Sequence, residues 1–118
     1  MENMAEATVT RTVRLDAPCC EVWQNLVRPE DLAAWMGGPV SVDVRPGGVG
    51  RASLPDGDRS ILVTSVDDEH RLGWLWWDDE GQVSSVELRL APEGAGCRLT
   101  VIERAVVNAP ASACLVGA

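Results

Sequence analysis

The sequence contains no lysine, phenylalanine or tyrosine, and its only histidine is His70. The ten basic residues form no run, and the net charge of −8 repels phosphate backbones, which argues against a nucleic-acid-binding protein. No apolar run reaches the roughly 18–20 residues of a membrane helix. The start of the chain also lacks the segments of a secretory signal peptide. We therefore expect a cytoplasmic protein that binds neither nucleic acid nor membranes.

Motifs for catalysis and for metal binding are also missing. His70 lies in a polar turn, and no serine or cysteine nucleophile can be assigned to it. The acidic turns at 67–70 and 78–81 lack the spacing of a calcium loop. The glycines of 47–50 lead into a strand and not into a helix, so they do not cradle a phosphate. We predict no cofactor and no metal.

What is present is typical of a folded domain. The chain has 118 residues, of which 46% are hydrophobic and 24% charged, enough to bury one core. No repeat, linker or low-complexity tract divides it. We therefore predict a single domain over residues 1–118.

Residues 7–15 alternate between polar and apolar side chains, which predicts a strand with one buried face. Val13 and Leu15 lie on that face. Arg11 falls on the same face. It is either a residue at the sheet margin with its charge in solvent or a cation inside a pocket.

A short helix is predicted directly after this strand. Asp16 is expected to cap it, because an aspartate side chain accepts hydrogen bonds from the free N–H groups of a first turn. Arg28 precedes Pro29, is therefore pushed out of the α region, and ends the helix. Apolar residues recur at helical spacing: Cys19, Val22, Trp23 and Leu26.

A second short helix is predicted from Pro29 to the glycine pair at 37–38. Its apolar face consists of Leu32, Trp35 and Met36. Both helices thus carry one apolar stripe that must be buried against another element.

The remaining chain predicts short strands separated by turns rich in glycine, proline and aspartate. These strands cover residues 40–44, 49–54, 60–66, 72–77, 83–90 and 97–106. In the last three, one face is predicted to point inward: Leu72, Trp74, Trp76, Val86, Leu88, Leu90, Cys97, Leu99, Val101 and Glu103. The helices must cover this face, which predicts an α+β fold with an antiparallel sheet.

Five tryptophans are the only aromatic residues. Trp23, Trp35 and Trp76 lie on apolar faces, so we predict that they fill the core and do not form an aromatic cage. Trp77 lies on the opposite face from Trp76, and we predict that it is a surface contact residue.

The four cysteines show no C-x-x-C spacing, so a zinc site is not supported. In the cytoplasm they are expected to be reduced thiols. Antiparallel pairing of the first and last strands would bring Cys97 near Cys19. We expect buried apolar cysteines, and the alternative is a soft-metal site formed by Cys19, Cys20, Cys97 and Cys114.

The order of several motifs resembles a known family. The segments LDAPCCEVW, RPEDLAAW, VDVRPGG, VTSVDDEHRLGWLW and CRLTVIERAV follow one another over about residues 7–107. They resemble the family named for the activator of heat-shock protein 90 ATPase, within the helix-grip superfamily of START domains and the birch-pollen allergen. The resemblance implies a curved antiparallel sheet, interrupted after its first strand by two short helices, that grips a C-terminal helix around a cavity.

The chain departs from this resemblance at its C-terminal end. A helix over residues 108–118 would be only about 15 Å long, too short to span the sheet. An uncovered apolar face would be larger than monomers usually expose. Either the C-terminal helix is truncated in this sequence, or something else closes the face, and we expect a second copy or a swapped element to cover it.

The resemblance also implies that the cavity holds an apolar small molecule or a lipid. We predict a pocket lined by Arg11, Val13, Leu26, Trp35, Met36, Trp74, Trp76, Val86, Leu88, Leu99, Val101 and Glu103. Arg11 and Glu103 would pair, either as a structural ion pair or as a polar anchor for the ligand. We favour non-enzymatic binding over a co-chaperone-like interaction module and over a cyclase-like enzyme that uses Glu103 and Arg11.

Overall fold

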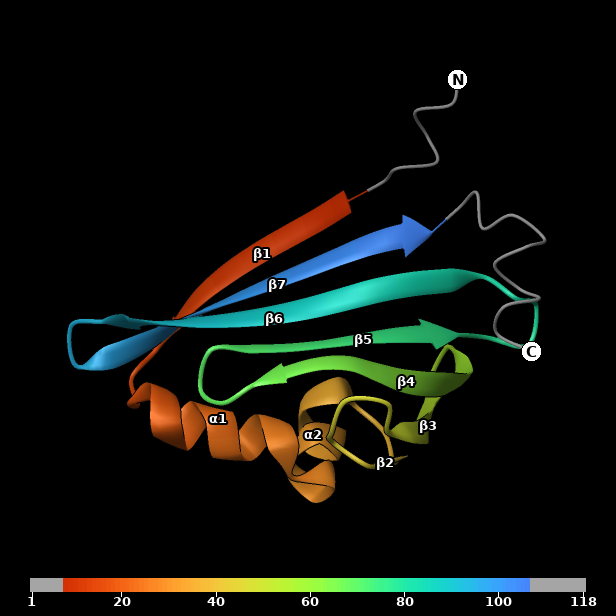
Figure 1. Cartoon of the computed structure of the whole chain (residues 1–118), viewed down its shortest axis with the longest axis horizontal. Helices are drawn as coiled ribbons and strands as arrows, with labels where there is room; N and C mark the ends of the chain where they lie inside the picture. The colour runs from red at the N-terminus through yellow and green to blue at the C-terminus, as the bar shows by residue number, and fades with distance from the viewer. Residues whose placement is uncertain (1–7, 107–118) are drawn as a thin grey trace.

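A computed structural model describes residues 8–106 as one seven-stranded antiparallel sheet with two short helices (Figure 1). The strands are β1 (Thr8–Leu15), β2 (Val40–Val42), β3 (Val49–Leu54), β4 (Gly57–Asp67), β5 (Arg71–Trp77), β6 (Val83–Glu93) and β7 (Gly96–Val106). Their order across the sheet is β1-β7-β6-β5-β4-β3-β2. The predicted α+β class is confirmed.

The first strand is the one that departs from a simple meander. β1 pairs with β7, from Thr8 opposite Arg104 to Leu15 opposite Cys97. The two helices, α1 (Cys19–Val27) and α2 (Pro29–Met36), occupy the gap in sequence between β1 and β2. Figure 1 shows both helices on the same side of the sheet. The sequence therefore predicted the helical interruption correctly.

The helix boundaries follow from proline and glycine. α1 ends at Arg28, whose extended backbone (ψ 124°) is the conformation that the following Pro29 requires. α2 ends at Gly37, which adopts the left-handed conformation (φ 92°) and donates its N–H to the carbonyl oxygen of Ala33 at 2.9 Å. Glycine takes this conformation without steric cost.

The predicted cap of α1 is wrong. The N-cap residue is Pro18, which makes no side-chain hydrogen bond to the helix. Asp16 instead forms an ion pair with Arg14 of β1. The extra residues between Asp16 and the helix carry its carboxylate away from the first turn, so the start of α1 lacks a side-chain cap.

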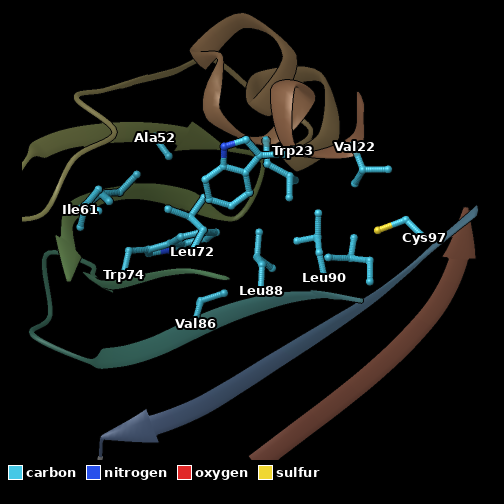
Figure 2. Packing of buried hydrophobic residues seen from close by; sticks show 13 residues of the cluster. Val22, Trp23, Ala52, Ile61, Leu72, Trp74, Val86, Leu88, Leu90 and Cys97 are labelled. Atoms are coloured by element: carbon cyan, nitrogen blue, oxygen red, sulfur yellow. The ribbon is translucent and has the colours of Figure 1, made fainter. Parts of the chain in front are cut away.

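The hydrophobic core lies between the helices and one face of the sheet (Figure 2). α1 contributes Val22, Trp23 and Leu26. The strands contribute the inward series predicted from alternation, and its most buried members are Leu72, Trp74, Val86, Leu88, Leu90, Cys97 and Leu99. Burial of this continuous apolar surface is the main favourable contribution to folding.

Two strand limits differ from the predictions. β4 begins at Gly57, because Leu54 pairs with Gly57 across a two-residue turn and the glycine takes a positive φ of 133°. β2 ends at Val42, because the chain then folds into a turn in which Gly48 donates its N–H to the carbonyl oxygen of Arg45 at 2.7 Å. The other predicted strands are confirmed to within a few residues.

Some predictions fall on parts of the chain that the structure does not describe. The short helix over 108–118 and Cys114 lie outside residues 8–106. Neither α1 nor α2 is long and apolar enough to cross a membrane.

Candidate ligand-binding site

A hollow of about 610 Å³ lies where β1 meets α1. It is lined by Leu15, Asp16, Ala17, Val22, Asn25, Leu26, Asp31, Ala34 and Leu99. We call this space the α1 hollow. β1 supplies one wall, the two helices supply another, and Leu99 of β7 supplies part of its floor. The hollow exists because the inward face of the sheet extends beyond the area that the helices cover.

The chemistry of the α1 hollow is apolar inside and polar at the rim. Leu26 and Leu99 are 3% and 2% exposed and form an apolar floor. Asp16 and Asn25 are exposed, which places carboxylate and amide groups where the hollow meets water. Such a site suits a ligand with an apolar body and one polar end.

The predicted pocket residues are only partly brought together here. Leu26 and Leu99 line the hollow, while Val86 and Leu88 are buried in the core. Met36 and Trp74 border a separate gap of about 10 Å³ beneath α2, no larger than one water molecule needs. The side chain of Trp35 lies outside what the structure describes.

The predicted pairing of Arg11 with Glu103 does not form among the described residues. The two side chains share the inward face, but the register sets Arg11 opposite Val101 and Glu103 opposite Val9. Each charge thus lies beside a valine on the neighbouring strand. Arg11 is exposed, as expected for a residue at the sheet margin.

The inward face of β1 is open to solvent. Val9 and Val13 are 51% and 47% exposed, whereas Leu99, opposite Val13, is buried. The apolar surface therefore continues from the α1 hollow to Val13, and Arg11 interrupts it before Val9. Val101 is partly buried in the same region.

The indoles of Trp74 and Trp76 on β5 are packed without hydrogen-bond partners among the described residues. The rings of Trp74 and Trp76 meet edge to face with centroids 5.8 Å apart, and the guanidinium of Arg59 lies 4.4 Å from the Trp76 centroid. The Nε1 atoms of both tryptophans are buried and have no partner among the described residues. The prediction that Trp23 and Trp76 pack against the core is confirmed.

The cysteines differ from the prediction of reduced thiols. Cys19 and Cys97 form a disulfide, and Cys20 is exposed and unbonded. The register explains the pairing, because Cys97 lies opposite the last residue of β1 and Cys19 begins the helix that follows. Within residues 8–106, no three potential ligands gather for a metal ion, so the soft-metal alternative is not supported there.

Comparison with protein families decides the relationship. The model of the family described as Activator of Hsp90 ATPase homolog 1-like protein matches residues 16–114. The chain belongs to this family. No curated protein matches the sequence of this family member.

Solved structures support the same assignment. CalU16 from Micromonospora echinospora is 28% identical with a TM-score of 0.71, over 86% of this chain and 62% of that one. DynU16, from the dynemicin biosynthetic locus, is 25% identical with a TM-score of 0.75, over 92% of this chain and 41% of that one. Ms6760 from Mycobacterium smegmatis is 25% identical with a TM-score of 0.64, over 81% of this chain and 70% of that one. This family member therefore spans less than two thirds of CalU16 and of DynU16.

The outer face of the sheet in this family member carries a second apolar surface. Cross-strand pairing aligns six apolar residues of this face in two neighbouring rows. We call these six residues the outer patch: Val49, Leu62, Leu75, Trp77, Val83 and Val106. Val49 is 67% exposed and Val106 37%. Trp77 is half-buried within this patch. Its role as a contact residue stays a prediction.

Charged residues lie on the same outer face. Glu87 accepts from Arg89 at 3.0 Å and also lies 3.6 Å from Arg71. The hydrogen bond from Arg89 to Glu87, aided by the carboxylate charge, raises the pKa of Arg89 above its ordinary value. Arg89 therefore stays charged under all physiological conditions.

Sequence reasoning missed most of the α1 hollow. Ala17 and Ala34 line it, and their small side chains leave space that larger residues would fill. Alternation and helical spacing identify which residues face inward, but they do not show where facing elements fail to meet. The signal in the sequence that could have indicated the hollow was the presence of small residues near the strand–helix connection.

Proposed function

We propose that this domain binds an apolar small molecule, such as a lipid chain or a polyketide-like ring system, in the α1 hollow. One observation carries this proposal: an open hollow of about 610 Å³ whose floor is formed by fully buried leucines. Binding pockets for small molecules typically measure about 300–1,000 Å³ and are mostly apolar. The polar rim would hold the ligand's hydrated end.

The similar structures are consistent with this role. DynU16 is described as a protein of the dynemicin biosynthetic locus. The arrangement of sheet and helices is shared with CalU16. The expected cytoplasmic location, and the expected second copy over the open face of β1, stay predictions.

Ala34→Trp should weaken ligand binding by about tenfold or more, equivalent to about 1.4 kcal/mol. Ala34 is exposed on α2 and lines the hollow, so an indole there occupies ligand space without disturbing the core. The dissociation constant of the fluorescent apolar probe anilinonaphthalene sulfonate measures the effect, and native mass spectrometry identifies any co-purified ligand.

Ala91→Trp provides the matched control, because Ala91 is exposed on β6 and its alternation with Leu90 places it on the outer face. It should leave the dissociation constant unchanged. Equal weakening by both variants, or unchanged binding in Ala34→Trp, would contradict binding in the hollow.

A second candidate function rests on the outer patch. The family is described by activation of the Hsp90 ATPase, and an exposed apolar surface on a sheet suits contact with another protein. In this alternative, the chain acts as a co-chaperone-like module. A cyclase-like enzyme has less support, because Arg11 and Glu103 form no ion pair within the described chain.

If the second function holds, adding the chain should raise the ATPase rate of an Hsp90-type chaperone, and Leu75→Glu should abolish the increase. Leu75 lies in the middle of the outer patch, paired with Leu62. Thr12→Glu is the control, because Thr12 is exposed on β1 away from the patch. An ATPase rate that does not respond to the chain would remove this candidate and leave the first untouched.

A further inference from the structure

The disulfide between Cys19 and Cys97 joins α1 to β7 beside the hollow. The two Cα atoms are 5.0 Å apart, within the roughly 4.4–6.8 Å that disulfides span. Cys19 is the first residue of α1, and Cys97 pairs with Leu15, the last residue of β1. The bond thus braces the connection between β1 and α1, where Asp16 and Ala17 line the hollow.

Apart from the disulfide, the start of α1 is held by partly buried Leu15 and Ala17, which pack against the core. Its N-cap, Pro18, makes no side-chain hydrogen bond to the helix. The buried residues of the helix, Val22, Trp23 and Leu26, all follow Cys19 in the chain. If the disulfide opens, these three side chains keep the body of α1 on the sheet while its N-terminal end is released.

We propose that the Cys19–Cys97 disulfide is a redox-sensitive latch that controls how tightly the α1 hollow holds its ligand. The inference rests on the proposed binding function and adds a means of regulation to that site. With the bond closed, the wall at Leu15 and Ala17 is fixed against the helix. With the bond open, the wall at Leu15 and Ala17 can move away from the helix, and the hollow loses its defined shape.

A dithiol reductant opens the latch in two exchange steps. One thiolate attacks Sγ of Cys19, the protein S–S bond breaks, and Cys97 leaves as a thiolate that takes a proton from water. The second thiol of the reductant attacks the mixed disulfide and releases Cys19 as a thiol. The protein gains two electrons and two protons, and the dithiol becomes its own disulfide. A small-molecule disulfide closes the latch by the reverse exchange.

Exposure decides which sulfur reacts. Cys97 is 0% exposed, whereas Cys19 is half-buried, so an attacking thiolate reaches Cys19. Cys20 is exposed and unbonded, one position along the chain. It shares the local surroundings of Cys19 without taking part in the bond, which makes it a matched control.

The experiment compares the full chain after mild oxidation and after reduction by a dithiol. Peptide mapping should find the peptides of Cys19 and Cys97 joined only in the oxidised sample. The dissociation constant of anilinonaphthalene sulfonate should rise about fivefold on reduction, the lower end of typical coupling between sites. Because coupling is reciprocal, saturating probe should make the disulfide harder to reduce by the same factor. Far-UV circular dichroism verifies that the reduced domain stays folded.

The variants separate the latch from general thiol chemistry. Cys20→Ser should retain both the joined peptides and the change in affinity. Cys97→Ser should bind the probe with one dissociation constant under both conditions. If Cys97→Ser does not fold, Cys19→Ser makes the same test at a half-buried position.

The possible failures are distinguishable. Joined peptides with equal probe affinity in both states would overturn the latch and leave the hollow as a binding site. Separate peptides after oxidation would overturn the latch directly. Absence of probe binding in both states would remove the proposed function and the latch together.

Discussion

Trp23→Ala is expected to lower the free energy of unfolding by about 3–5 kcal/mol. Trp23 is 7% exposed, and Figure 2 shows its indole reaching from α1 toward the sheet. Removal of the indole leaves a cavity between the helix and the sheet. The hydrogen-bonded strands cannot move far enough to fill this space. Urea unfolding followed by far-UV circular dichroism measures the loss without relying on the missing indole.

Trp77→Ala is the control for this substitution. Trp77 is half-buried on the outer face, with no helix packed over it in the described chain. Its loss should be less than half that of Trp23→Ala. Equal losses would mean that α1 is not anchored to the sheet through Trp23.

Gly48→Ala should destabilise the domain by about 3 kcal/mol, the upper part of the range for overpacking. An added Cβ would overlap the carbonyl oxygen of Asp43 and lie 2.9 Å from its carbonyl carbon and 3.0 Å from the oxygen of Arg45. All three are backbone atoms, so no side chain can rotate away. The turn also accepts a hydrogen bond from Val63 of β4 at 2.8 Å, which ties it in place. Urea midpoints measure the effect.

Gly47→Ala tests whether overlap is the cause. A Cβ at Gly47 meets nothing within 4 Å, but its φ of +83° is strained for alanine and should cost about 1–2 kcal/mol. Gly48→Ala should therefore be the more destabilising of the two neighbours. The opposite order would show that the turn can open to admit the methyl group.

The sequence carries most of the fold because its local patterns agree with each other. Period-two alternation placed Leu88 and Leu99 inward, and both are almost fully buried. Pro29 and Gly37 marked helix boundaries through backbone restrictions that depend on no distant contact. These features needed only the geometry of one strand or one helix, which is why they could be predicted.

The candidate site depends on geometry between elements, and here prediction was weaker. Arg11 and Glu103 were placed on the same face correctly, but whether they pair depends on the register of β1 against β7. That register places Arg11 opposite Val101, two residues along the strand from Glu103. The proximity of Cys19 and Cys97 followed from strand pairing, whereas their bond contradicts an expectation based on compartment alone. The hollow itself reflects a gap between packed elements, and no single residue encodes a gap.

The pairing of β1 with β7 also determines when the domain can be completed. Thr8 pairs with Arg104, so β1, the first of the described strands to be synthesised, must wait for β7, the last of them. α1, α2 and the hairpins from β3 to β7 form from neighbouring segments, while closing β1 onto the sheet requires a loop of nearly the whole described chain. We expect this domain to complete its sheet only after synthesis of β7, with β1 unpaired until that moment.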